Sequence, residues 1–207
     1  MKPIIALDAD GVLLDYNLAY RRAWDKAFNT LPSERDPLAY WPIDRWDVLK
    51  LEGNELAHFR AYFDQQFWSE IPAISGAVEA CLALRKAGYQ LVCVSAMDKR
   101  YEAARLKNLR DCGFPIERVI VTESLESVIS PKAAALRELH PVAFVDDYLP
   151  YLRGIPNNVH AALVLREPNG SPNVGPDLML AHSQHADLIE FSRWWLDCRG
   201  PVREFLF

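Results

Sequence analysis

From residue 75 onward the chain alternates short apolar runs with longer segments of helical periodicity. Short apolar runs bounded by turn residues are typical of buried strands, and apolar residues three or four positions apart indicate helices. The pattern predicts helices over residues 75–87, 99–112, 131–139 and 184–197, and strands over 90–95, 118–122, 142–145 and 161–165. This alternation implies βαβ units, and therefore a Rossmann-like α/β fold with a parallel sheet flanked by helices.

The first strand is separated from the others by a long block. An apolar run at residues 4–7 predicts that strand, but residues 16–72 show no clear strand pattern. The block contains a helical segment through Tyr20, Trp24 and Phe28 and a predicted helix over 54–69. We therefore expect a core domain of residues 1–15 and 73–207, with a small, mostly α-helical domain of residues 16–72 inserted after the first strand.

Composition excludes several classes of partner. The net charge of -5 argues against a nucleic-acid polymer, although a bound cation could still recruit an anionic substrate. The four cysteines form no C-x-x-C pair, which indicates reduced thiols. The first residues lead directly into a predicted strand, so we expect no signal peptide, and no apolar run is long enough to predict a membrane span. We expect a cytoplasmic monomer or homodimer that does not bind membranes.

Polar residues follow three of the predicted strands. The first strand ends in Asp8-Ala9-Asp10-Gly11-Val12, the strand at 90–95 ends in Ser95, and the strand at 142–145 is followed by Asp146-Asp147. Alternation along a strand places the Asp8 and Asp10 side chains on the same side. Because ligands bind at the carboxyl ends of parallel strands, these groups are expected to meet. Taken singly, Ser95 could be an ordinary strand-end hydroxyl, and Asp146-Asp147 a turn or helix cap.

A lysine is predicted at a helix start. In Ser130-Pro131-Lys132, Ser130 has the character of an N-cap and Pro131 of the first helical residue. A cation in the first turn opposes the helix dipole by roughly 0.3–1 kcal/mol, which indicates an anionic partner for Lys132. Lys107 is a weaker rival for the same role.

Together these groups suit phosphoryl transfer. One carboxylate attacks phosphorus to form an aspartyl-phosphate, and a second carboxyl group protonates the leaving oxygen and then activates water. A lysine and a divalent cation neutralise the negative charge of the phosphoryl group. Mg²⁺ suits a site made of oxygen ligands.

The order of these residues resembles the four motifs of the haloacid dehalogenase superfamily, in its phosphatase branch with a C1-type helical cap. The resemblance covers roughly residues 4–165 and places the insertion of residues 16–72 where that family has its cap. It implies that Asp8 is the nucleophile and Asp10 the general acid and base. It also implies that Ser95 binds the transferring phosphoryl group and that Lys132 orients Asp8. Ser95 stands where many members have Thr, which keeps the hydroxyl.

The resemblance also implies a cofactor, Mg²⁺. Its ligands would be Asp8, Asp10 through its backbone carbonyl, Asp146 and, directly or through water, Asp147. The activity implied is a Mg²⁺-dependent phosphatase that hydrolyses a small phosphorylated metabolite through an aspartyl-phosphate.

Other activities were weighed against this one. True haloacid dehalogenases lack the second aspartate, so Asp10 favours phosphate esters. A receiver domain has its acidic pair, hydroxyl and lysine in another order, and no Gly-rich nucleotide motif is present. Two alternatives remain open: a sugar-phosphate mutase of the same superfamily, and a phosphate-binding or interaction module that has lost catalysis.

The insertion is expected to set specificity. About two thirds of its large rings are expected to form its own core. The rest could stack on a base or sugar ring, which makes a nucleotide monophosphate one candidate substrate; the rings are Tyr16, Tyr20, Trp24, Trp41, Trp46, Phe67 and Trp68. Arg21 or Arg22 could bind a second anionic group or lie on a solvated helix face. The five histidines are expected to pack or lie on the surface rather than bind metal.

Overall fold

The structure is a computed structural model that describes residues 2–122 and 128–202. Its centre is a 6-stranded sheet with the order β3-β2-β1-β4-β5-β6, and the pairing of neighbours is parallel throughout. The strands are β1 (Ile4–Leu7), β2 (Gln90–Ala96), β3 (Val119–Thr122), β4 (Ala143–Asp146), β5 (His160–Val164) and β6 (Ser183–His185). The predicted Rossmann-like α/β class is confirmed.

Both faces of the sheet are covered because side chains alternate along each strand. In β1, Ile5 and Leu7 belong to one buried apolar cluster and Ala6 to the other. The first cluster includes residues of α5 (Ala77–Lys86), α6 (Glu102–Asp111) and α8 (Leu188–Arg199), and the second includes residues of α7 (Ala133–Leu139) and the 3-10 helix η2 (Leu149–Leu152). Strands buried on both faces explain the nearly continuous apolar runs in the sequence.

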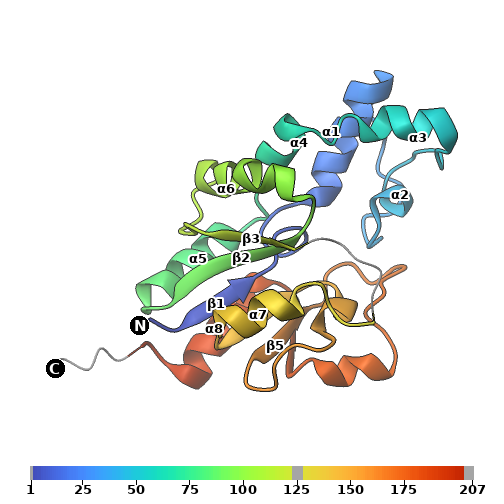
Figure 1. Cartoon of the computed structure of the whole chain (residues 1–207). Helices are drawn as coiled ribbons and strands as arrows, with labels where there is room; N and C mark the ends of the chain where they lie inside the picture. Colours follow the sequence, from blue (N-terminus) through green and yellow to red (C-terminus); the bar gives the residue numbers. More distant parts are fainter. Residues whose placement is uncertain (1, 123–127, 203–207) are drawn as a thin grey trace.

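The insertion lies between β1 and β2 in the chain. Its helices are α1 (Tyr16–Phe28), α2 (Pro42–Arg45), α3 (Gly53–Arg60) and α4 (Gln65–Ser69). Figure 1 shows α1, α3 and α4 gathered beyond the end of the sheet toward which β1 points. Aromatic rings pack between these helices; the ring centres of Trp24 and Phe59 lie 5.2 Å apart, and those of Tyr16 and Phe67 lie 5.8 Å apart. The division into domains at residues 15/16 and 72/73 stays a prediction.

Three predicted elements differ from the structure. The helix predicted over 54–69 is divided into α3 and α4, and Asp64 begins α4 by accepting a hydrogen bond from the Phe67 amide at 2.9 Å. The helix predicted over 99–112 begins as the 3-10 turn η1 (Lys99–Tyr101) and continues as α6.

The helix predicted over 184–197 starts later in the structure. Residues 183–185 form β6 beside β5, and α8 begins at Leu188 after Asp187 accepts from the Glu190 amide at 2.7 Å. Three residues are too few to show a strand period, so only the neighbouring strand reveals β6. Another 3-10 helix, η3 (Pro176–Leu180), precedes it. Within the described residues, none of the helices is long and apolar enough to cross a membrane.

Candidate active site

A buried ion-paired cluster lies where β1 and β4 end side by side. Leu7 pairs with Val145, and the Asp8 amide donates to the Val145 carbonyl at 2.9 Å. Lys132 Nζ lies 2.6 Å from Asp8 Oδ1 and 2.7 Å from Asp146 Oδ2. Asp8, Lys132 and Asp146, here called the inner cluster, are all buried. The structure therefore brings together three residues that are far apart in the sequence.

Lys132 has the anionic partners that its position predicted. Burial would lower the pKa of Lys132, but the charges of Asp146 and Asp8 raise it above its usual value, so the ammonium stays protonated. The local prediction needs one correction, because α7 begins at Ala133 rather than at residue 131. Ser130 Oγ still accepts from the Lys132 amide at 3.2 Å.

The rival lysine lies outside the site. Lys107 pairs with Asp111 one turn further along α6, and both side chains are exposed. Only Lys132 of these two lysines contacts the predicted nucleophile.

Asp10 is held by a residue that the sequence did not single out. Arg105 Nη2, from α6, lies 2.7 Å from Asp10 Oδ2 and 2.9 Å from Asp10 Oδ1. Arg105 is fully buried, and its guanidinium lies 5.1 Å from the centre of the Trp68 ring. Burial raises the pKa of the Asp10 carboxyl, and the Arg105 charge opposes that rise.

A signal for Arg105 was present in the helix periodicity. Arg105 lies on the same buried face of α6 as Ala104, Asn108 and Leu109. A cation on an inward helix face requires a buried anion. That argument could have identified Arg105 as a site residue, although it could not have chosen Asp10 as its partner.

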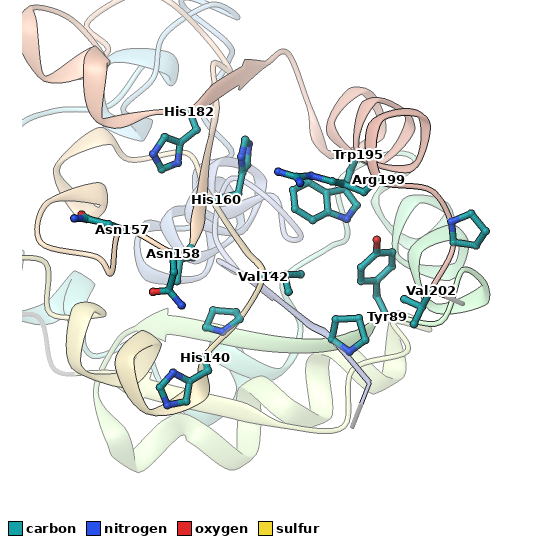
Figure 2. Close-up of a pocket in the computed structure, with 14 residues that line it drawn as sticks. Tyr89, His140, Val142, Asn157, Asn158, His160, His182, Trp195, Arg199 and Val202 are labelled. Atoms are coloured by element: carbon teal, nitrogen blue, oxygen red, sulfur yellow. The ribbon is translucent and has the colours of Figure 1, made fainter. Parts of the chain in front are cut away.

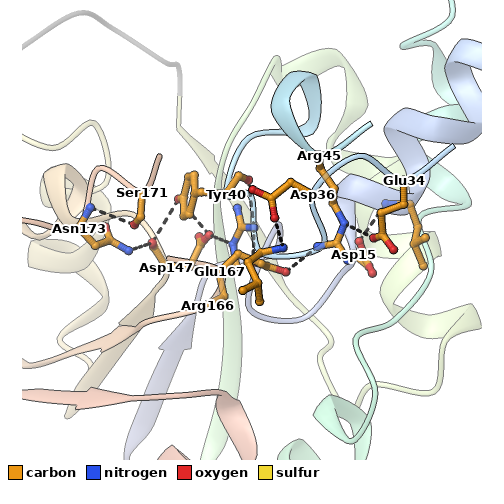
Figure 3. Close-up of polar contacts among 12 residues, drawn as sticks. Asp15, Glu34, Asp36, Tyr40, Arg45, Asp147, Arg166, Glu167, Ser171 and Asn173 are labelled. Atoms are coloured by element: carbon orange, nitrogen blue, oxygen red, sulfur yellow. Dashed lines mark hydrogen bonds and ion pairs between the residues drawn. The ribbon is translucent and has the colours of Figure 1, made fainter. Parts of the chain in front are cut away.

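Asp147 belongs to a second cluster, which joins the core to the insertion (Figure 3). Arg166 Nε donates to Asp147 Oδ2, and the Tyr40 hydroxyl donates to the same oxygen at 3.1 Å. The Arg166 guanidinium lies 4.0 Å from the centre of the Tyr40 ring. Tyr40, Asp147 and Arg166 are here called the outer cluster. Sequence analysis identified only Asp147 of the three.

Hydrogen bonds with a side chain also fix the backbone around Asp147. Asn173 Nδ2 donates to the Asp147 carbonyl at 2.7 Å, and Asn173 Oδ1 accepts from the Leu149 amide at 2.8 Å. A Cβ atom at Gly11, whose φ is +89°, would lie 2.2 Å from Asp147 Oδ2. The glycine after Asp10 is therefore required both by its backbone conformation and by the close approach of Asp147.

Ser95 takes its predicted place at the end of β2. Its neighbour across the sheet is Val121 of β3, and the Ser95 side chain is almost fully buried. Ser95 lines the same cavity as Asp8, Asp10 and Asp147. Four of the predicted site residues, which come from the ends of three strands, therefore line one cavity.

That cavity has a volume of about 370 Å³. Three of the seven predicted rings line it, Tyr16, Trp41 and Trp68, together with three that were not singled out, Tyr40, Tyr148 and Tyr151. The other rings pack within the insertion, as expected for most of them; Tyr20, for example, lies 5.0 Å from Phe59. Arg21 does not line the cavity, since its Nε donates to the Pro32 carbonyl at 2.8 Å. Arg22 lines a separate hollow on the insertion.

A larger cavity, of about 850 Å³, lies at the other end of the sheet (Figure 2). Histidine, asparagine and aromatic side chains line it, but no carboxylate or cysteine does among the described residues. His160 packs 5.3 Å from the ring of Trp195, and burial lowers the pKa of His160 to about 4. His182 Nδ1 accepts from the Ala161 amide at 2.8 Å. These histidines pack as expected, and this cavity lacks the groups that the chemistry needs.

A family model identifies the family of the chain. Residues 3–149 match the model described as haloacid dehalogenase-like hydrolase, which covers more than half of the chain. The chain belongs to this family. The matched region contains Asp8, Asp10, Ser95, Lys132 and both aspartates of the last motif.

Solved structures of haloacid dehalogenase-like proteins share the fold. A haloacid dehalogenase family hydrolase from Deinococcus radiodurans R1, described with bound phosphate and sodium, is 16% identical over 97% of this chain and 98% of that one, with a TM-score of 0.60. A putative beta-phosphoglucomutase from Thermotoga maritima is 16% identical over 94% and 99%, with a TM-score of 0.58. An L-2-haloacid dehalogenase is also 16% identical over 94% and 99%, with a TM-score of 0.55. At these identities the likeness shows the fold alone. No curated protein sequence matches the chain.

The described residues fit a divalent cation of the kind that the family uses. Asp8, Asp146 and Asp147 each offer one carboxylate oxygen, and these oxygens all lie within 4.8 Å of one another. Burial raises the pKa of Asp146 and of Asp147. The charge of Lys132 beside Asp146 and that of Arg166 beside Asp147 oppose this rise only in part. The three carboxylates together carry one more charge than Lys132 and Arg166 balance, so the group is left with a net negative charge. Oxygen ligands of this kind suit Mg²⁺.

The side chain of Asp10 is not part of this group. Its carboxylate turns to Arg105 instead. A role for the Asp10 backbone carbonyl in metal binding stays a prediction.

Proposed function

We propose that this protein is a Mg²⁺-dependent phosphatase that hydrolyses a small phosphomonoester through an aspartyl-phosphate. The observation that carries the proposal is the pairing of Asp8 with Lys132 at 2.6 Å, with a second carboxyl group, Asp10, lining the same cavity. A dehalogenase releases halide, which needs no proton, whereas an alkoxide leaving group does. Asp10 is the group that distinguishes the two activities.

In the first step an Asp8 oxygen attacks phosphorus and the bond from phosphorus to the ester oxygen breaks. Asp10 donates its proton to that oxygen, and the alcohol leaves. In this proposal Lys132, which pairs with Asp8, holds Asp8 in position, and Ser95, which lines the same cavity, donates a hydrogen bond to the phosphoryl group. Bound Mg²⁺, held by Asp8, Asp146 and Asp147, would neutralise negative charge on the phosphoryl group.

In the second step water attacks the phosphorus of the aspartyl-phosphate. Asp10, now a carboxylate, accepts the proton of that water, and the bond between phosphorus and Asp8 breaks. Inorganic phosphate leaves and both aspartates return to their starting state. Arg105 Nη2, which lies within hydrogen-bond distance of both Asp10 oxygens, orients the Asp10 carboxyl group.

The remaining expectations are proposals too. All four cysteines are free, which supports a reducing compartment such as the cytoplasm. The sugar-phosphate mutase and the catalytically inactive module remain alternatives. Stimulation by a bisphosphorylated sugar with slow net phosphate release would favour the mutase.

The deciding experiment replaces the nucleophile. The purified protein with Mg²⁺ is expected to release phosphate from p-nitrophenyl phosphate, and Asp8→Asn to lower kcat by about 10³-fold or more, because the nucleophile is lost. Asp111→Asn is the matched control, since Asp111 is an exposed carboxylate outside the cavity. An Asp8→Asn variant with wild-type turnover would contradict the mechanism. Wild-type protein that binds Mg²⁺ but hydrolyses no phosphate ester would favour the inactive module.

A further inference from the structure

The cavity above Asp8 is lined mainly by rings. Six aromatic side chains line it, four from the insertion and two from the core: Tyr16, Tyr40, Trp41, Trp68, Tyr148 and Tyr151. A volume of about 370 Å³ lies within the usual range of small-ligand sites. The phosphoryl group would occupy the end near Asp8, so the leaving group must lie among the rings.

One of these rings, that of Trp41, does not pack in the aromatic core of the insertion. Trp41 is 41% exposed. The centre of its ring lies 4.8 Å from that of Tyr40 and 6.3 Å from that of Tyr148, and both of these residues also line the cavity. The inner rings of the insertion are different, because Trp24 and Phe59 are buried. Trp41 therefore leaves a large apolar surface at the cavity that a flat ligand would cover.

The charges that the described residues bring to the cavity argue against a second anionic group on the substrate. Arg166 is the one cationic side chain that lines it among the described residues, and its charge is balanced by Asp147 and by Glu167, the latter at 2.8 Å. Lys132 and Arg105 are fully buried and paired with aspartates. A second phosphate or a carboxylate would meet the cavity's aspartates without a cation of its own.

The uncharged polar groups of the cavity also limit the leaving group. Within the described part of the chain, the cavity lining includes no Asn, Gln or His, and its hydroxyl groups belong to Ser95 and the tyrosines. A sugar ring can also stack on aromatic side chains, but a nucleoside adds a flat base, which can cover more of the Trp41 ring than a sugar alone. A leaving group that carries a flat aromatic ring is therefore the better match.

We propose, resting on the phosphatase function above, that the substrate is a phosphomonoester whose uncharged leaving group carries an aromatic ring, as in a nucleoside 5′-monophosphate. The ring lies against Trp41, and the phosphate lies at Asp8. Trp41 is then a specificity-determining residue supplied by the insertion to the chemistry of the core.

The test compares substrates that break the same kind of bond. AMP and UMP share the 5′ ester linkage of ribose 5-phosphate and differ from it by the base. With Mg²⁺, kcat/KM is expected to be about 5- to 100-fold higher for the nucleotides, since stacking of one base on an aromatic side chain contributes that much. Trp41→Leu is expected to bring this ratio close to 1, mainly by raising KM for the nucleotides, and Trp41→Phe to restore most of it.

Leu49→Ala is the matched control, because Leu49 is an apolar residue of the insertion that is 76% exposed and outside the cavity. Equal kcat/KM for the nucleotides and ribose 5-phosphate in the wild type would overturn the inference while leaving the phosphatase function in place. So would an unchanged ratio in Trp41→Leu, or a clear preference for glucose 6-phosphate or a bisphosphorylated sugar. No phosphate release from any of these esters or from p-nitrophenyl phosphate would overturn the phosphatase function itself.

Discussion

The inner and outer clusters lie side by side at the carboxyl edge of one sheet, yet they are built from different parts of the chain. The inner cluster comes only from core segments, and Lys132 lies between two aspartates that it contacts directly. The outer cluster needs Tyr40 of the insertion as well as Asp147 and Arg166 of the core. The same kind of interaction, a cation on a buried carboxylate, therefore joins core segments around the proposed nucleophile in one cluster and attaches the insertion in the other.

The attachment extends beyond the outer cluster. The Tyr40 amide donates to the Asn169 carbonyl at 2.9 Å, and the Asn169 amide donates to the Leu38 carbonyl at the same distance. Arg45 of α2 pairs with Glu167 at 2.9 Å. Residues 38–45, which carry Trp41, are thus fastened to the segment that follows β5. We expect losses in the inner cluster to abolish the chemistry, and the loss of Tyr40 or Arg166 from the outer cluster to act mainly through substrate binding.

The largest effect expected after that of Asp8→Asn is that of Lys132→Met. Removing this cation leaves two buried carboxylates without their partner, which destabilises a protein by about 3–5 kcal/mol. Loss of the contact with Asp8 is also expected to lower kcat by about 10²- to 10³-fold. Urea unfolding and steady-state kinetics measure the two effects.

Lys107→Met is the matched control for Lys132→Met, because Lys107 forms an exposed pair with Asp111 on α6. Its stability and kcat should match those of the wild type. If Lys132→Met kept the stability and kcat of Lys107→Met, the prediction that the inner cluster supports both the fold and the reaction would be wrong.

Arg166→Gln is expected to have a smaller effect than Lys132→Met, and to change KM more than kcat. This variant keeps part of the hydrogen bonding to Asp147 but removes the charge and the contact with the Tyr40 ring. We expect KM to rise by about 10-fold, with a smaller fall in kcat, because residues 38–45 lose one attachment. A fall in kcat as large as that of Lys132→Met, with KM unchanged, would show that the two clusters do not differ as proposed.

The smallest effect is expected from Arg45→Gln. The Arg45 side chain is 18% exposed and pairs with Glu34 and Glu167 near the surface. Such pairs contribute up to about 1 kcal/mol, so we expect a change in KM of about 3-fold or less that shrinks further at high salt. Kinetics at low and high ionic strength measure it. A change that grows with added salt would contradict an electrostatic attachment.

The predicted residues Asp8, Ser95, Lys132 and Asp146 all reach one edge of the sheet because each follows from local rules. Asp8 follows β1 directly, Asp146 ends β4 and Ser95 is the last residue but one of β2. Lys132 precedes a helix that packs on the sheet. The strand β6 and the break between α3 and α4 could not be predicted in the same way. A strand of three residues has too short a pattern, and the helix break depends on the capping of α4 by Asp64.

The sequence by itself determined the Rossmann-like order of strands and helices and which residues at the strand ends are proposed to carry the chemistry, because strand alternation and helix capping act over a few positions. Only the tertiary structure decided which residues surround that chemistry. Arg105 reaches Asp10 across 95 positions, and Tyr40 reaches Asp147 across 107. Such contacts depend on how distant segments pack against each other, and local periodicity contains no information about that.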